Sequence, residues 1–311
     1  MRQFRNGLAI AIAALLLTTA MAPLALAKDD DGPAGLRKMI AVVEFEDKSD
    51  RSRWRWTGPN PGIGMSDMLT TELVKSGKFM VMEREQLHHV LAEQDLGQSG
   101  RVTEQTAPQV GKLLGVAAVV YGSVTEFGYS AADWEVKKGG FGGLGVSKTT
   151  ARAAIDVRMI DTTTGEIILA DTASDEKSQM GLKVSKDDLA VAFDGKFDET
   201  LVGKATRESI EKLVEMITKS LKDVPWTGRV VKASAGKIYL NAGQTVGITQ
   251  GMEFKVYRPG EELIDPATGL SLGAEEEYVG KISASEIKEK YSICAAVEGS
   301  GFEAGDMVRY E

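Results

Sequence analysis

The first apolar run after residue 38 predicts a buried strand. Residues 39–45 are almost entirely apolar, and the run ends at Glu46 and Asp47. A polar loop follows over residues 48–61. Apolar side chains then recur at helical spacing until Gly77, namely Met65, Met68, Leu69 and Leu73. The pattern therefore predicts a strand, a loop and a helix in that order.

The same alternation repeats along the next fifty residues. Residues 79–82 predict a short strand, and Leu87, Val90 and Leu91 give a second helix one apolar face. Thr106 and Gln109 have capping-box spacing and begin a third predicted helix that ends at Gly115. Residues 116–120 predict a buried strand that continues toward residue 127. Strands that alternate with helices favour an α/β fold in which helices cover a sheet.

Residues 151–174 predict an antiparallel hairpin. Ile155, Val157 and Met159 alternate with polar residues, and a Thr-rich turn at residues 162–165 precedes the partner strand. The longest predicted helix follows, with its apolar face formed by Ile210, Leu213, Val214, Ile217 and Leu221. We expect this helix to pack across the sheet.

Pro225 marks a predicted domain boundary, because the remaining chain consists of short strand-like runs separated by glycine-rich turns. The runs are residues 229–233, 237–240, 252–257, 278–284 and 292–297. A small all-β barrel is the natural closure for such runs. The expected architecture is an α/β domain over residues 39–224, followed by a β domain over residues 225–311.

The N-terminal residues predict in which cellular compartment the protein is located. Residues 1–27 combine a basic start, an apolar stretch and a small-residue cleavage pattern at Ala25-Leu26-Ala27, which is typical of a secretory signal peptide. An uncleaved membrane anchor is the alternative. Residues 28–38 would then be a flexible acidic start. We therefore expect a periplasmic protein, with association to the outer membrane as a further option.

Composition and charge argue against several classes of function. The formal net charge of −8 gives no overall attraction for nucleic acid. The single cysteine, Cys294, excludes an intramolecular disulfide and a cysteine-cluster metal site. His88 and His89 are adjacent on a predicted helix and point in different directions, so they suit neither metal chelation nor a catalytic triad. Residues 140–145 contain a G-x-G-x-x-G spacing, but no predicted helix follows it. The sequence predicts no catalytic, cofactor-binding or metal-binding residue.

The most suggestive loop motif is Trp54-Arg55-Trp56, with Arg51 and Arg53 just before it. Tryptophan and arginine are enriched in protein interfaces. These three residues are therefore candidate interaction residues. The alternative is that one or both rings pack on the sheet of their own domain, because large aromatic side chains are usually mostly buried.

Several segments in order resemble the CsgG family of curli production and transport components. They are Ile40-Ala41-Val42-Val43-Glu44-Phe45, residues 79–87, residues 112–115 leading into 120–124, and residues 155–167. The resemblance implies a fold shared with the N-terminal domain of TolB and with lipoprotein activators of peptidoglycan synthases. The C-terminal part resembles the C-terminal domain of flagellar assembly protein T, through Gly236 to Gly243, Val246-Gly247-Ile248, residues 264–269 and Gly305-Asp306-Met307-Val308.

The family resemblance also implies two insertions, at about residues 127–151 and 174–199. In family secretion channels each subunit is lipidated and contributes two hairpins to a transmembrane barrel. This chain has no lipid-accepting cysteine. Its second insertion is highly charged, and two lysines and five glycines interrupt residues 134–146 of the first one. Trp134, Phe141 and Leu144 of the first insertion join the candidate interaction residues.

The expected function is non-enzymatic, in assembly or secretion of a cell-surface structure through protein–protein binding or formation of a homo-oligomeric ring. The expected partners are envelope assembly or secretion proteins, without a cofactor. The alternative is an oligomeric outer-membrane export channel of the curli-secretion type. A third hypothesis, an envelope hydrolase, is disfavoured because spacing assembles no acid, base or nucleophile constellation.

Overall fold

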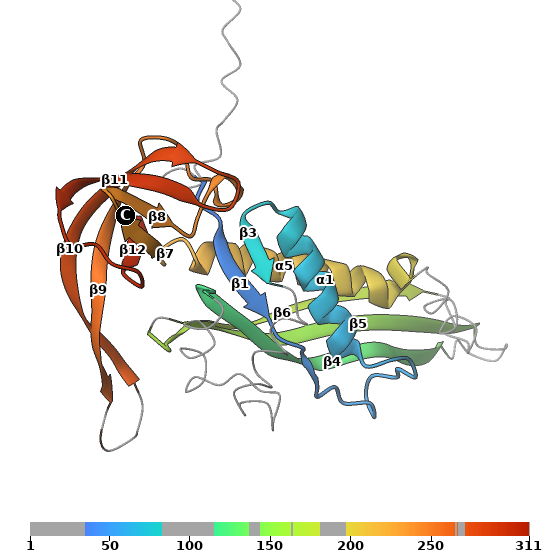
Figure 1. Ribbon diagram of the computed structural model, residues 1–311. Coiled ribbons are helices and arrows are strands. Elements are labelled where there is room, and N and C mark those ends of the chain that lie inside the picture. The colour runs from blue at the N-terminus through green and yellow to red at the C-terminus, as the bar shows by residue number, and fades with distance from the viewer. Residues whose placement is uncertain are drawn as a thin grey trace, which may run out of the picture. The chain divides into compact units, whose positions relative to one another are not determined.

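The computed structural model describes residues 35–82, 115–136, 144–162, 164–180, 197–264, 266 and 271–310. Within these ranges, side chains are described except at residues 131–136, 144–147, 262, 264 and 271–273. The predicted signal peptide, the helices predicted around residues 87–91 and 106–115, His88, His89 and the glycine spacing at residues 140–143 lie outside the described residues. The chain contains a mixed sheet with helices on it, and a closed barrel (Figure 1).

The mixed sheet has the strand order β3-β1-β4-β5-β6, and a short strand β2 pairs with β4 in addition. β1 (Lys38–Val42) is parallel to β3 (Phe79–Met82) and to β4 (Ala118–Val136), and β2 (Glu46–Asp47) is also parallel to β4. β5 (Leu144–Asp161) is antiparallel to β4 and to β6 (Ile167–Met180). The hairpin predicted over residues 151–174 is therefore present, and it is part of a longer ladder.

Two described helices pack on this sheet, α1 (Pro61–Lys75) and α5 (Leu201–Ser220), which lie side by side in Figure 1. The Asn60 side chain caps α1 by accepting from the Gly62 amide, and Thr200 caps α5 by accepting from Gly203. A 3-10 turn (Phe197–Glu199) precedes α5. The predicted helix faces are confirmed as buried, including Met65, Leu69 and Leu73 of α1 and Ile210, Leu213 and Ile217 of α5.

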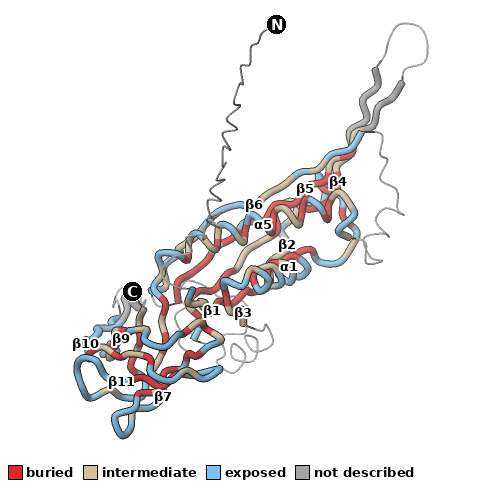
Figure 2. Tube along the Cα trace, turned by 90° about the horizontal axis from the view of Figure 1, so that it is seen from above, coloured by how far each residue is buried: buried red, intermediate tan, exposed pale blue. Residues whose placement is uncertain are grey.

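The core of this part lies between the two helices and the sheet, and Figure 2 shows the buried residues running along these elements. Ile155, Val157 and Met159 all point into this core. Arg152, Asp156 and Arg158 alternate with them and are partly or fully exposed. The alternation read from the sequence therefore assigned the two faces of β5 correctly.

Residues 226–310 form a closed barrel with the order β10-β11-β8-β7-β12-β9. Its strands are β7 (Trp226–Ser234), β8 (Lys237–Leu240), β9 (Glu253–Ile264), β10 (Ser271–Ile287), β11 (Ser292–Gly299) and β12 (Met307–Tyr310), and a 3-10 turn (Gln244–Val246) follows β8. The barrel has its own core, which includes Leu240, Phe254, Val256, Ile282 and Val308. The predicted β-barrel is confirmed. Its last strand, β12, was not predicted.

Candidate functional site

The loop that carries the predicted interaction motif lies against β4. The backbone of Arg55 forms a two-way bridge with Tyr129, in which the Arg55 amide donates to the Tyr129 carbonyl at 2.9 Å and the Tyr129 amide donates back at 3.2 Å. Gly128 makes this approach feasible, because a Cβ there would lie 2.7 Å from the Arg55 carbonyl oxygen. The loop is therefore fixed to the sheet.

The two tryptophans of the motif are buried, while Arg55 between them is exposed. Trp54 is 4% exposed and Trp56 is 7% exposed. The Trp56 ring packs edge-on against Phe127 with ring centroids 4.8 Å apart, and its Nε1 donates to the Pro59 carbonyl at 2.9 Å. These positions match the alternative in which the rings pack on their own domain. Of the three motif residues, only Arg55 offers its side chain to a partner in this conformation.

Polar side chains order the first part of the same loop. Asp47 accepts hydrogen bonds from Ser49 and Arg51, and although partial burial acts to raise its pKa, these bonds lower it overall. The Arg53 guanidinium lies 5.6 Å from the centre of the Trp54 ring, within the range of a cation–π contact. Arg51, Arg53 and Arg55 are all exposed on this loop. The loop therefore presents basic rather than aromatic groups.

The two predicted insertions leave the sheet beside this loop. The β4–β5 ladder continues through Trp134 opposite Val146 to the pair of Val136 and Leu144, so the first insertion begins as a regular hairpin. The side chains of Trp134 and Leu144 are not described, and Phe141 lies outside the described residues. β6 extends to Met180, within the second predicted insertion, whose charged residues 181–196 lie outside the described residues.

One row of paired residues across the sheet connects the Arg55 loop with the roots of both insertions. Tyr129, the backbone partner of Arg55, pairs with Ala151 on β5, and Ala151 pairs with Lys177 on β6. The loop, the root of the first insertion and the root of the second insertion therefore lie at one end of the sheet.

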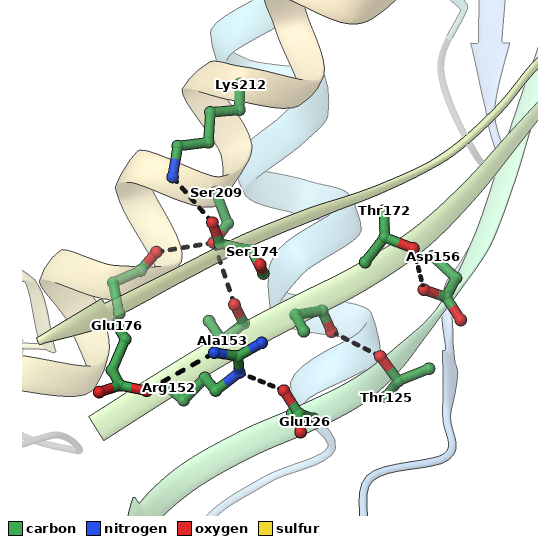
Figure 3. Close-up of polar contacts among 12 residues, drawn as sticks. Thr125, Glu126, Arg152, Ala153, Asp156, Thr172, Ser174, Glu176, Ser209 and Lys212 are labelled. Atoms are coloured by element: carbon green, nitrogen blue, oxygen red, sulfur yellow. Dashed lines mark hydrogen bonds and ion pairs between the residues drawn. The ribbon is translucent and has the colours of Figure 1, made fainter. Parts of the chain in front are cut away.

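Charged side chains link the strands at this end, as Figure 3 shows for one face. Arg152 on β5 pairs with Glu126 on β4 through its Nε atom, and its Nη1 atom lies 3.5 Å from Glu176 Oε2 on β6. We call these three residues the strand clamp. The sequence did not indicate the clamp, because its members meet only through the cross-strand register.

A second group of charges joins β6 to α5. Asp175 lies 2.9 Å from Lys212 and 3.1 Å from Lys177, and Lys177 lies 2.6 Å from Glu208 on α5. Partial burial acts to raise the pKa of Asp175, but the hydrogen bonds and charges of Lys212 and Lys177 lower it overall. The Ser209 hydroxyl also donates a hydrogen bond to the Ala153 carbonyl oxygen at 3.2 Å (Figure 3). The helix is thus tied to the hairpin root by polar as well as apolar contacts.

The described residues contain no group of three or more His, Cys, Asp or Glu side chains that could hold a metal ion. In the same described part of the chain, no helix is both long and apolar enough to cross a membrane. Cys294 is buried in the barrel, and burial raises the pKa of its thiol to about 11.

Solved structures that resemble this chain are distant. The hypothetical protein CT253 from Chlamydia trachomatis is 17% identical, with 60% of this chain and 98% of that chain covered and a TM-score of 0.40. The lipoprotein GNA1162 from Neisseria meningitidis is 15% identical, with 52% and 96% covered and a TM-score of 0.31. TolB from Acinetobacter baumannii is 10% identical, with 84% and 58% covered and a TM-score of 0.28. No curated protein matches.

The sequence pattern of one family matches much of the chain. This family is described as the curli production assembly/transport component CsgG, and the match runs over residues 23–228. It ends at the start of the barrel, so the resemblance of the C-terminal part to flagellar assembly protein T stays a prediction. The family resemblance expected from the sequence is confirmed, and the chain belongs to the CsgG family.

Proposed function

We propose that this protein acts without catalysis in the cell envelope, where it takes part in the assembly or secretion of a surface structure. It does so by binding other envelope proteins or by forming a homo-oligomeric ring. Membership of the CsgG family supports a curli-related or envelope role. The proposed location is the periplasm, after export by the signal peptide.

The observation that carries the proposal is the gathering of three segments at one end of the sheet. The Arg55 loop, the β4–β5 hairpin and the end of β6 follow one another along the row Tyr129, Ala151 and Lys177. Arg55 is exposed on the loop, and Arg152, Glu176 and Lys177 are partly or fully exposed at the roots of the two insertions. Such a charged surface suits a protein partner better than a small substrate.

Site-specific photocrosslinking in cells tests this proposal. A photoreactive residue at position 55 is expected to yield crosslinked protein adducts, because Arg55 is exposed at the proposed contact end. A matched probe at Asp67, which is exposed on α1 and belongs to none of the three segments, serves as the control. Equal adduct yields at the two positions, or none at either, would contradict the proposal.

An oligomeric export channel is the second candidate function. The length of the β4–β5 ladder favours it, since pairing continues to Val136 and Leu144 at the very tip of the described hairpin. Cell fractionation separates the two candidates. Recovery with the periplasm as a monomer or small oligomer supports the binding role. Recovery only from detergent-extracted outer membrane, as a large ring, supports the channel.

A further inference from the structure

The barrel divides its charge between two halves of its sequence. Residues 226–252, which form β7, β8 and the turn after them, contain three basic residues and no aspartate or glutamate. Residues 253–277, a range that includes β9 and the first part of β10, contain seven acidic residues and only two basic ones. The chain as a whole carries a formal net charge of −8.

The strand order places the two halves on opposite walls of the barrel. In the closed order β10-β11-β8-β7-β12-β9, the pair β8–β7 is separated from the pair β9–β10 by β11 on one side and by β12 on the other. Two opposite walls therefore carry the exposed charges of opposite sign: Lys232 and Lys237 on one, and Glu253, Glu261, Glu275, Glu276 and Glu277 on the other. A body of this kind can attract a second copy of itself in a head-to-tail orientation.

The basic wall consists of β7, β8 and the neighbouring turn at residues 288–291. Lys232 pairs in register with Tyr239, and the Tyr239 ring lies 6.3 Å from the Tyr291 ring of the turn. The hydrogen bond and charge of Lys288, with a smaller contribution from Lys237, lower the pKa of Glu286. These groups form one surface, which also includes the exposed Lys290 and Glu289. Glu286 and Glu289 offset Lys288 and Lys290, so the net positive charge of this wall comes from Arg229, Lys232 and Lys237.

Apolar surface is exposed within the basic wall. Val231 is 56% exposed and Tyr291 is 41% exposed. Exposed ion pairs alone contribute little to association, whereas aromatic and aliphatic groups supply buried area in an interface. The basic wall therefore has both the charge and the apolar groups that an interface needs.

The acidic wall consists of the long β9–β10 ribbon, which Figure 1 shows as one projecting hairpin. Among the described residues, β12 pairs with β9 only as far as Tyr257, and β11 pairs with β10 only as far as Gly280. Beyond these points the ribbon exposes Glu261, Glu275 and Glu277.

The acidic wall also exposes apolar groups. Tyr278 is 45% exposed, and its ring packs against Tyr257 with centroids 5.6 Å apart. The Arg309 guanidinium lies 4.9 Å from the Tyr257 ring and forms two 2.6 Å contacts with Glu276. Both walls thus carry tyrosines among charges, so they complement each other in composition as well as in sign.

We infer that the basic wall of one barrel docks on the acidic wall of the barrel of a second copy, so that copies associate head to tail through their C-terminal domains. Every copy carries both walls, so such contacts continue until a ring closes or a filament grows. This inference deepens the proposed function, since it rests on the premise that the protein acts by association. It assigns a specific homotypic contact to the barrel.

Charge reversal on the full exported chain tests the inference. One variant reverses the basic wall with Lys232→Glu, Lys237→Glu and Lys290→Glu, and the other reverses the acidic wall with Glu261→Lys, Glu275→Lys and Glu277→Lys. Sedimentation velocity measures association over a range of concentrations at about 20 mM and about 500 mM salt, because screening weakens exposed charge pairs. We expect the unaltered chain to associate at low salt, and each variant to associate about tenfold more weakly.

An equimolar mixture of the two variants provides the decisive measurement. The basic wall of one variant still meets an intact acidic wall on the other, and the two reversed walls also complement each other. The mixture is therefore expected to regain the stronger association that each variant alone has lost. The matched control is Lys204→Glu, Lys219→Glu and Lys222→Glu, three exposed lysines in or just after α5, which is expected to associate like the unaltered chain. Circular dichroism verifies that each variant is folded.

Three results would overturn the inference: a monomeric unaltered chain at low salt, variants that associate like the unaltered chain, or a mixture that associates no more strongly than either variant alone. If phosphatidylglycerol vesicles bind the unaltered chain but not the basic-wall variant, and the mixture fails to associate, the basic wall recognises an anionic lipid instead. Crosslinking from position 55 does not depend on the barrel charges. Its result therefore separates failure of this inference from failure of the proposed function.

Discussion

Gly62 of α1 lies directly against the main chain of Phe45, so closely that a Cβ atom at position 62 would be 2.0 Å from the Phe45 carbonyl oxygen. Phe45 follows β1 and is fully buried in the helix-covered core. The first turn of α1 therefore rests on the backbone that leaves β1. The segment that carries Arg55 runs between these two contacting residues.

Alanine substitution at two glycines of α1 is expected to have opposite effects. Gly62→Ala should destabilise the protein by about 2 kcal/mol or more, because the methyl group meets backbone that cannot move without shifting β1 or α1. Gly64→Ala is the matched control, since a Cβ there has open space. It should raise stability by up to about 1 kcal/mol through helix propensity. Urea unfolding of both variants measures the difference, and equal effects would contradict the contact.

The two tryptophans of the loop provide a second paired test. Trp56→Phe removes the donor to the Pro59 carbonyl and reduces packing on Phe127, so we expect a loss of about 1 to 2 kcal/mol. The Trp54 Nε1 atom is buried without a hydrogen-bond partner in the described structure. Trp54→Phe should therefore cost less than Trp56→Phe, because burial of an unsatisfied donor is itself unfavourable. Thermal unfolding measures the stability loss of both variants. A larger loss in Trp54→Phe than in Trp56→Phe would contradict a stabilising hydrogen bond from Trp56 to Pro59.

Local periodicity predicted much of the helix-covered part of the fold. Helical spacing identified the buried faces of α1 and α5, and alternation identified Ile155, Val157 and Met159 as core residues of β5. These signals work because burial on one face of an element forces a period of 3.6 or 2 on the sequence. Turn residues and short apolar runs likewise indicated the barrel.

Features that depend on distant pairing could not be predicted in the same way. β12 has only four residues and one fully buried side chain, Val308, and it exists because β7 and β9 both pair with it. The burial of Trp54 and Trp56 depends on where β4 places Phe127 and Tyr129. The clamp formed by Arg152 depends on the register of three strands. None of these relationships leaves a periodic signal in the local sequence.

Acid should weaken the attachment of β6 to α5. The pKa of Asp175 is lowered in the folded protein, so its contribution to stability is fully present above the unfolded-state pKa of about 3.9 and is lost as the pH falls toward the folded-state value. Asp175→Asn should lower stability at pH 7 and make the fall in stability below about pH 4 shallower. Urea unfolding from pH 7 to pH 3 measures both effects. Asp171→Asn, an exposed change on the same strand, should leave the profile close to that of the unaltered chain.

The thiol of Cys294 should be inert in the folded protein. Burial raises its pKa to about 11, and the side chain lies in the barrel core, so little thiolate is present and reagents have poor access. Labelling with a thiol-reactive disulfide at pH 8 should be at least about a hundredfold slower in buffer than in denaturant. Similar rates in the two conditions would mean that the barrel opens readily. The denatured chain serves as its own control, because it contains the same single cysteine.

Arg152 of the strand clamp should contribute more to the stability of the protein than Arg158, which has a similar place on β5. Arg152 and Arg158 both point away from the helix-covered face of β5, but only Arg152 pairs with acidic side chains on β4 and β6 at once. Partly exposed ion pairs contribute from a few tenths to about 1 kcal/mol each. Arg152→Met should therefore cost about 1 kcal/mol, and Arg158→Met less than about 0.5 kcal/mol.

The location of the clamp gives this comparison a second readout. Because Arg152 joins β4, β5 and β6 where both insertions begin, its loss should increase local opening there more than it lowers global stability. Hydrogen exchange of the amides near Tyr129 and Lys177 is expected to accelerate in Arg152→Met and to stay unchanged in Arg158→Met. A uniform change across the whole sheet in Arg152→Met would instead mean that the clamp supports the fold as a whole. In that case the end of the sheet that carries the Arg55 loop would not be a separately adjustable binding surface.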